Sequence, residues 1–356
     1  MGLFKSLFGG KNDKPKLSMS IQTNTASKTA KVGSKVQDLV LLSLADKYKV
    51  GEKKYPSYLR EKYGIGFPEE KLQDLYAKGY IRPATAIESL SSLKLSELKD
   101  IATAFGLKSS GKKDELCARI AESVTEVALQ GRVNERNWIV TDSGRELLEK
   151  NHYIAFYMEK HPYSLEAVGL DINSYSKLFS TNPNGRVRDV LWGEFNRRSL
   201  DYYQKAMTKG DFRDYCDLLR TMSLFVEEEE RHADALALYM RYIFYRSNFE
   251  AGLKAINTYA FLKRVQDAAE TLYINSELYP FIADELLQMS NSCGYDSVKL
   301  QTYMVGAFSR EQDSGVFSAE ELSQFVMSEL NGDKDNAQKI CLKVMKSASK
   351  KIPKRK

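Results

Sequence analysis

The chain has 356 residues, of which 43% are hydrophobic and 28% charged, and its formal net charge is +6. This length allows two or three domains with cores of their own, and the composition is that of an ordinary globular protein rather than a disordered or fibrous one. No apolar run is long enough to span a bilayer, and no secretory signal is evident. The four cysteines are scattered without a C-x-x-C pair, which argues against a zinc site or a disulfide framework and favours a reducing, cytoplasmic location.

Residues 1–34 are expected to form a short amphipathic leader and a flexible linker. Met1–Ser6 matches the pattern for N-myristoylation, a match without meaning in a bacterial or phage protein. The apolar residues of Met1–Phe8 alternatively form a short sticky peptide for a partner or a membrane surface, and an exposed leader is the simplest interpretation. Residues 9–34 are rich in Gly, Lys, Ser, Thr and Asn, as linkers are.

Three short helices with apolar faces are expected in residues 35–89. The first begins near Ser34, the second covers Tyr55–Ile65, and the third begins at Pro68 and is closed by Gly79. Short helices joined by tight turns are similar to the core of a winged-helix domain. Plain helical packing explains the same pattern equally well.

Residues 90–124 contain the most informative pattern of the chain. Apolar residues at three- and four-residue spacing predict a helix with Ser96 as its N-cap and Gly106 at its end, after which Leu107 turns back into a small core. A second helix is expected after Gly111. The apolar positions of the two helices are Leu93, Leu95, Leu98, Ile101, Ala102, Phe105, Leu116, Ile120 and Val124.

Lys108, Lys112 and Lys113 are crowded into the loop and the start of the second helix. Backbone N–H groups at a helix start favour anions, so lysines beside them suit a phosphate backbone. The same loop nearly spells the phosphate-binding loop of nucleotide hydrolases. However, Lys113 stands where a hydroxyl should ligate magnesium, and a helix rather than a strand precedes the glycine. A nucleotide site is therefore rejected.

The run L-K-L-x-E-L-K, then G-L, then S-G-K-K-D-E-L and Arg-Ile resembles the SAP module, a short helix–loop–helix of chromatin, repair and phage proteins. The resemblance implies binding to double-stranded DNA, often A·T-rich, mainly through shape and phosphate contacts. Similar modules also contact proteins, and six basic against five acidic residues leave 90–124 a net charge of only +1. The resemblance assigns DNA contact to Lys94, Lys99, Lys108, Ser110, Gly111, Lys112, Lys113 and Arg119.

Residues 125–150 are expected to contain a short strand that leads into a helix. Trp138–Thr141 alternates as a strand does, and Thr141 or Asp142 suits the N-cap of the following helix. This segment is similar to the strand-into-helix ending of many winged-helix proteins. That similarity would make the SAP-like module an insertion between the third helix and the wing.

Residues 151–345 are expected to form a helical domain. Ser164–Phe179 is predicted to be one helix, and Gly210 and Glu227–Glu230 separate three later ones. These three helices are Val187–Lys209, Asp211–Val226 and Arg231–Arg246. The last two resemble a tetratricopeptide-like hairpin without its full signature. One interpretation is a peptide groove, and the other is core packing of the tyrosines. The groove would be lined by Tyr239, Arg241, Tyr242, Tyr245 and Arg246.

Over its whole length the order of parts resembles SAP-containing proteins of bacterial prophages and other mobile elements. The resemblance rests on Val190–Arg198, Lys209–Arg213 and Ala235–Tyr239. It implies no established activity, and it indicates that the C-terminal region is one shared domain rather than a linker.

No pattern of an enzyme is evident. Only three histidines are present, and motifs of zinc proteases, serine hydrolases and dinucleotide enzymes are missing. Glu229 and His232 have the spacing of a metal half-site, but the chain has no second copy of the motif, and a solvated helix start explains the glutamates. We therefore expect a non-enzymatic protein with no metal, cofactor or small-molecule substrate.

Residues 346–356 hold six positive charges in eleven positions and no acid, so a solvated basic tail is predicted that adds non-specific phosphate contacts. The sequence as a whole thus predicts a mainly α protein that binds duplex DNA non-specifically or with A·T preference, and whose helical domain binds a protein partner. The alternative is a helical interaction protein or phage structural protein in which the SAP-like unit has no DNA role.

Overall fold

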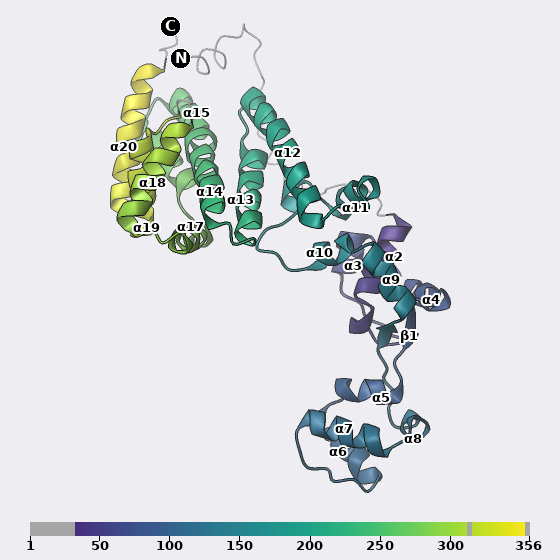
Figure 1. Ribbon diagram of the computed structural model, residues 1–356. Helices are drawn as coiled ribbons and strands as arrows, with labels where there is room; N and C mark the ends of the chain where they lie inside the picture. Colours follow the sequence, from purple (N-terminus) through teal and green to yellow (C-terminus); the bar gives the residue numbers. More distant parts are fainter. Residues whose placement is uncertain (1–32, 312–314, 353–356) are drawn as a thin grey trace. The chain divides into compact units, whose positions relative to one another are not determined.

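The computed structural model of the protein describes residues 33–311 and 315–352. The described chain is mainly α-helical with one two-stranded sheet, which confirms the predicted fold class. It divides into two compact units (Figure 1). We call residues 33–160 and 171–187 the N-terminal unit, and residues 161–170, 188–311 and 315–352 the helical unit. The predicted leader and nearly all of the linker lie outside the described residues.

The N-terminal unit begins with the three helices that the sequence predicts. These are α2 (Ser34–Ser43), α3 (Tyr58–Tyr63) and α4 (Pro68–Ala77), with a 3-10 turn, η1 (Ala45–Lys47), after α2. α2 is the central element, because its apolar residues 39–42 are buried and α4 packs against it. α3 is shorter than expected, since Gly64 takes a positive φ of 65° and ends it. Gly79 terminates the turn after α4 with a φ of 76°, as predicted.

A two-stranded antiparallel ribbon follows α4. It pairs β1 (Ile81–Pro83) with β2 (Trp138–Val140), so that Ile81 lies opposite Val140. Trp138 is buried, and its ring packs against Tyr76 with the ring centroids 5.6 Å apart. The sequence predicts the second strand but not the first, because three residues ending in a proline give too short a period-2 pattern to detect.

Helix α9 (Asp142–Lys150) starts directly after β2, as expected from the cap at Thr141. The Thr141 hydroxyl accepts a hydrogen bond from the backbone N–H of Gly144 at 3.2 Å. A Cβ at Gly144 would lie 2.2 Å from the carbonyl oxygen of Tyr80, so this position needs a glycine for close approach of the helix to the backbone just before β1. The strand-into-helix prediction for this segment is confirmed.

The segment between the two strands, residues 84–137, forms a separate small bundle that we call the inserted module. Its helices are α5 (Ala86–Ser89), η2 (Leu90–Ser92), α6 (Leu95–Ala104), α7 (Lys113–Ser123) and α8 (Glu126–Gln130). Its two ends meet at the ribbon, where the N–H of Ala84 donates to the carbonyl of Asn137 at 2.8 Å. The module therefore occupies the place of the turn between β1 and β2.

Two further helices complete the N-terminal unit, α10 (Tyr153–Met158) and α11 (Ile172–Thr181), and both contact α2. Their aromatic rings form a small cluster, in which Tyr153 and Phe179 stack with centroids 4.7 Å apart. The single helix predicted for 164–179 is wrong. Gly169, with a φ of 75°, ends a short 3-10 turn, η3 (Glu166–Val168), and Asp171 then caps α11 separately.

The helical unit is a succession of helices, most of them separated by short turns. They are α12 (Val187–Lys209), α13 (Arg213–Glu227), α14 (His232–Tyr245), the π-helical segment η4 (Arg246–Ala251), α15 (Gly252–Leu262), α16 (Val265–Ser276), α17 (Pro280–Ser292), α18 (Ser297–Arg310), α19 (Ala319–Leu330) and α20 (Lys334–Lys351). α13 packs on α14, α15 on α16, and α19 on α20. The three helices predicted between 187 and 246 are present, with breaks at Gly210 (φ 69°) and Glu230 (φ 59°). The tetratricopeptide-like character stays a prediction.

The basic segment predicted as a tail from Lys346 onward is helical as far as Lys351, because α20 continues to that residue, and Lys346, Lys350 and Lys351 are exposed to solvent as expected. Val344 and Met345 are buried, and α20 packs on α16 and α19, so the apolar face of the helix reaches the residue before the segment assigned to the tail. Residues 353–356 lie outside the described residues. Among the helices of the described residues, none combines the length and the apolar character that crossing a membrane requires.

Candidate nucleic-acid interface

The inserted module has a hydrophobic core of its own. All buried members of this core come from residues 86–133, and they include Ala86 from α5 and Leu129 from α8. The predicted apolar positions Leu98, Leu116 and Ile120 are fully buried in it. The folded element is thus larger than the two predicted helices, since α5 and α8 close the core at the side of the ribbon.

The N-cap of the first predicted helix lies two residues before its expected position. The residue at the N-cap of α6 is Lys94, not Ser96, because the carboxylate of Glu97 accepts the backbone N–H of Lys94 at 2.6 Å. The end of the helix agrees with expectation. Gly106 has a φ of 68°, and Leu107 turns back so that its N–H bonds the carbonyl of Ala102 at 2.8 Å.

Side chains of α7 hold the loop between α6 and α7 in place. The guanidinium of Arg119 donates to the carbonyl oxygens of Lys108 and Ser110, the second at 3.0 Å. Gly111 has a φ of 128°, and a Cβ there would lie 2.6 Å from the carboxylate of Glu115. That carboxylate in turn accepts the N–H of Lys112 at 3.1 Å. The loop is therefore fixed by hydrogen bonds rather than by burial.

This arrangement displays the three loop lysines to solvent. Lys108, Lys112 and Lys113 are exposed, and none of them forms an ion pair within residues 33–311 and 315–352. They lie on the loop and on the first residues of α7, where backbone N–H groups add positive potential. Asp114 and Glu115 lie in the same turn, so the local charge is mixed. The structure thus brings together the three residues that sequence reasoning placed together.

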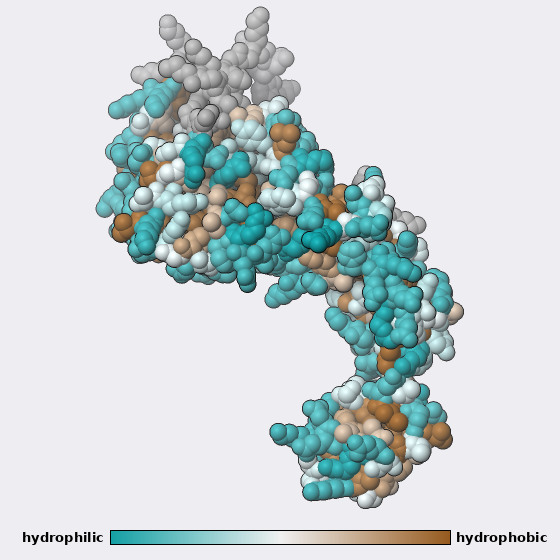
Figure 2. Space-filling model, in the orientation of Figure 1, coloured by the Kyte–Doolittle hydropathy of each residue, from teal (hydrophilic) through white to brown (hydrophobic). Residues whose placement is uncertain are grey.

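The other residues assigned to DNA contact have different roles or positions. Lys94 and Lys99 are exposed on α6, and Ser110 is exposed in the loop. Arg119 is only partly exposed, and its guanidinium is engaged with the loop carbonyls. We therefore regard Arg119 as a positioning residue for the loop. The surface of the module is not uniformly polar, since Leu95 and Val127 are 41% and 78% exposed, and Figure 2 shows apolar residues among the polar ones on its visible face.

The join between ribbon and module contains two structural carboxylates. Both oxygens of Glu126 accept backbone N–H groups at the start of α5, those of Ala86 at 2.7 Å and Ile87 at 2.9 Å. Glu88 pairs with Arg82 of β1 through two hydrogen bonds of 2.7 Å. The hydrogen bonds from Arg82, with a backbone contribution from Thr85, lower the pKa of Glu88 to about 2. These contacts orient α5 on the ribbon. The T-x-x-E capping box is the sequence signal that could have revealed the role of Glu88.

The tyrosines assigned to a peptide groove are core residues of the helical unit. Tyr239, Tyr242 and Tyr245 are at most 6% exposed. The hydroxyl of Tyr239 donates to the carbonyl of Ile282 at 3.1 Å and to Glu285 at 2.9 Å, and burial raises the pKa of this tyrosine strongly. These rings fill space between helices and do not line an open groove.

The two arginines of the same assignment are also engaged internally. Arg241 forms an ion pair with Glu311 at 3.0 Å. Arg246 donates to the carbonyl oxygens of Ser276 at 3.0 Å and Glu277 at 2.9 Å, and so ties η4 to the end of α16. The spacing of the assigned tyrosines and arginines in the sequence suggests a binding surface, because a single sequence does not show which helices pack against these side chains.

The apparent metal half-site at Glu229 and His232 is not assembled as one. Glu229 bonds Arg188 at 2.6 Å, whereas the His232 ring bonds Glu227 at 2.9 Å. Within the described residues no group of three or more His, Cys, Asp or Glu side chains is placed to hold a metal ion.

Comparison with known proteins identifies one family. The model of the SAP domain matches residues 89–125, which cover α6, α7 and the loop between them. The chain therefore contains a SAP domain, and domains of this family generally bind DNA, which supports a DNA-binding role. No curated protein and no solved structure matches the chain, so the resemblance to prophage proteins has no support from a homologue.

Proposed function

We propose that the protein binds duplex DNA through the loop and second helix of its SAP domain, without strict sequence preference or with preference for A·T-rich sites. The observation that carries the proposal is the group of Lys108, Lys112 and Lys113, exposed without ion-pair partners in the described structure and presented on a loop that α7 holds in place. Long flexible lysines suit phosphate contacts, which fix a protein on DNA without reading its sequence.

The charge of the domain sets the expected strength of binding. The net charge of residues 90–124 is only +1, so non-specific attraction from the module alone is small. Three phosphate contacts give a salt slope of about −2.7 in a plot of log K against log salt concentration, or roughly 40-fold weaker binding between 50 and 200 mM salt. The protein is accordingly a moderate binder whose affinity depends on other contacts as well.

The place of the module in the fold supports the idea that the rest of the N-terminal unit serves to hold the SAP domain. The module is connected to both strands at one end of the β1–β2 ribbon, where Pro83 pairs with Trp138, and three helices precede that ribbon as in a winged-helix domain. In this proposal the winged-helix-like unit carries the SAP domain at the position of its wing tip. The protein has no catalytic role, and it uses the helical unit to bind a protein partner.

A second candidate function is a helical interaction protein whose SAP domain makes no DNA contact. An exposed aromatic pair on the helical unit favours it. Tyr279 and Phe281 are about half exposed and stack with centroids 5.9 Å apart, with Arg246 over the first ring and Arg220 over the second. Tyr and Arg, together with Trp, are enriched at the energetic centres of protein interfaces.

The experiment that separates the two functions is a titration of labelled duplex DNA at two salt concentrations. The test variant replaces Lys108, Lys112 and Lys113 with glutamate. Negative charge is compatible with the first turn of α7, so the module is expected to fold. The control variant replaces Lys209, Lys263 and Lys299 with glutamate. These exposed lysines of the helical unit also lack an ion pair among the described residues.

We expect the test variant to bind at least about tenfold more weakly than the wild type at low salt and the control to bind nearly normally. Equal affinity of the test and control variants, or no binding by the wild type at low salt, would overturn the proposed function. In the latter case, capture of a partner by wild type but not by a Tyr279→Ala, Phe281→Ala variant would support the second candidate.

A further inference from the structure

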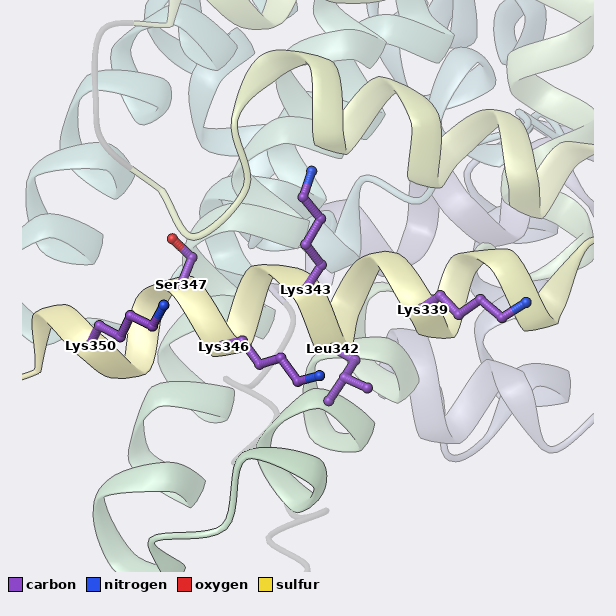
Figure 3. Close-up of a pocket in the computed structure, with 6 residues that line it drawn as sticks. All are labelled: Lys339, Leu342, Lys343, Lys346, Ser347 and Lys350. Atoms are coloured by element: carbon purple, nitrogen blue, oxygen red, sulfur yellow. The ribbon is translucent and has the colours of Figure 1, made fainter.

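The last helix of the helical unit, α20, has two chemically distinct faces. Its buried residues are Ala337, Ile340, Cys341, Val344 and Met345, and they pack on α16 and α19. The opposite side carries Lys339, Lys343, Lys346 and Lys350, all exposed. At 3.6 residues per turn these four lysines fall within an arc of about 60° centred opposite the buried face. Together with Leu342 and Ser347 they line a shallow groove along the helix (Figure 3).

This lysine face is poor in neutralising acid. Lys343 forms an ion pair with Glu321 of α19 at 3.2 Å, and in Figure 3 its side chain points away from that of Lys346. Lys339, Lys346 and Lys350 form no ion pair within the described residues. No acidic residue follows Asp335 in the sequence, so none lies on the helix beyond its first turn.

Helix stability does not account for the pattern. A lysine in the last turn is favoured by the helix dipole, which explains Lys350. Lys339 lies in the first half of α20, where the dipole offers no gain, and like charges three and four residues apart repel each other. The row of lysines is therefore better explained by binding of a negatively charged ligand than by a contribution to the stability of α20.

We propose that this face of α20 is a second contact surface for the phosphate backbone of duplex DNA, separate from the SAP domain. The lysines from 339 to 350 extend over about 16 Å of helix, enough for several successive phosphates of a DNA strand. The serine hydroxyl in the groove is a further donor of the kind that contacts phosphate oxygens. The inference rests on the proposed function only for the choice of DNA as ligand.

The chemistry of the face favours nucleic acid over an acidic protein. Protein interfaces are enriched in Tyr, Trp and Arg and depleted in Lys, and this face contains lysines with no aromatic or arginine anchor. Phosphate backbones, in contrast, can be bound by flexible lysine side chains that act as point charges and need no close fit of surfaces. An acidic protein ligand is accordingly the alternative that remains for this face if loss of its lysines leaves DNA binding unchanged.

The test uses the full chain and a long duplex DNA, with affinity measured over a series of salt concentrations. One variant replaces Lys339, Lys346 and Lys350 with glutamine, which keeps helix propensity and leaves the Lys343 ion pair intact. The matched control replaces Lys209, Lys263 and Lys299 with glutamine and thus loses the same charge. A third variant replaces Lys108, Lys112 and Lys113 with glutamine. Thermal unfolding checks that all variants fold alike.

We expect the α20 variant to bind about tenfold more weakly at low salt than the control, with a salt slope smaller in magnitude by two to three units, about 0.9 for each lost phosphate contact. An α20 variant that matches the control in affinity and slope would overturn this inference, whatever the SAP variant does. A loss in the α20 variant with no loss in the SAP variant would support the inference and overturn the proposed function. Absence of DNA binding by the wild type at low salt would overturn both.

Discussion

The inserted module and the helical unit use charged and polar side chains in opposite ways. In the module a small aliphatic core supports a loop whose lysines are exposed without ion pairs within the described residues. In the helical unit the arginines and tyrosines at the predicted groove bond neighbouring helices, as Tyr239 does with Ile282. A basic or aromatic stripe thus indicates a binding surface only where no neighbouring helix engages it. By that criterion the stripe of α14 is not a binding surface, whereas the lysine face of α20 meets the condition for the DNA contact that we propose.

The largest expected effect tests whether the module folds on its own core. Leu116 is fully buried there, and Leu116→Ala is expected to destabilise the module by about 2–5 kcal/mol, because it removes buried methyl groups and leaves a cavity. Hydrogen exchange measured by mass spectrometry should show faster exchange in residues 84–137 and unchanged exchange in the helical unit. Leu95→Ala, at a leucine 41% exposed, is the control with an expected effect below about 1 kcal/mol. Equal acceleration in both units would contradict independent cores.

The next prediction concerns the tyrosines of α14. Tyr239→Phe removes a buried hydroxyl and leaves the Ile282 carbonyl and Glu285 without this donor, so we expect a loss of about 1–3 kcal/mol in the free energy of unfolding of the helical unit. DNA affinity should not change. Tyr279→Phe, at a half-exposed tyrosine, serves as control and should leave stability unaltered. A fully stable Tyr239→Phe protein that loses partner binding would restore the groove interpretation.

A substitution of Arg119 distinguishes two possible roles of this residue, namely positioning of the loop and direct contact with DNA. Arg119→Gln removes the donors to the Lys108 and Ser110 carbonyls and loosens the loop, so we expect roughly fivefold weaker DNA binding. The salt slope should stay as in the wild type, because no phosphate contact is lost. A slope reduced in magnitude by about 0.9 would instead identify Arg119 as a direct phosphate contact.

The smallest expected effect lies at the join between ribbon and module. The pKa of Glu88 is lowered to about 2 by Arg82, so its charged form stabilises the folded state at pH values above its ordinary pKa. That contribution is lost as pH falls from about 4.5 toward 2, where the folded carboxyl also gains a proton. Both side chains are more than one-third exposed, so solvent screening keeps the contribution below about 1 kcal/mol.

Thermal unfolding of Glu88→Gln should therefore show a small deficit relative to wild type at neutral pH that disappears near pH 2. Glu122→Gln, at an exposed glutamate of the same module, is the matched control. A deficit that persists unchanged at pH 2 would show that packing, and not charge, is responsible.

The sequence predicts local features of this protein well where short-range physics decides them. The positive-φ glycines at the ends of α4 and α6, the Thr141 cap and the three helices after residue 187 are all present as expected. The wrong helix boundaries arise where a single side chain or a single glycine outweighs the apolar pattern of the segment. The cap at Lys94 depends on Glu97 reaching back, and the break at Gly169 outweighs an apolar pattern that continues through it.

The sequence by itself determined the mainly α fold, the SAP domain and the residues of its loop, because hydrophobic periodicity, capping and turn chemistry act over a few neighbouring residues. Only the tertiary structure decided which charged side chains remain available. Packing between distant helices engages Arg241 and Arg246, ribbon pairing places the module between β1 and β2, and burial of one side of α20 converts an expected tail into an ordered lysine face. Such long-range contacts depend on which helix lies beside which, and a single sequence does not encode that in any local pattern.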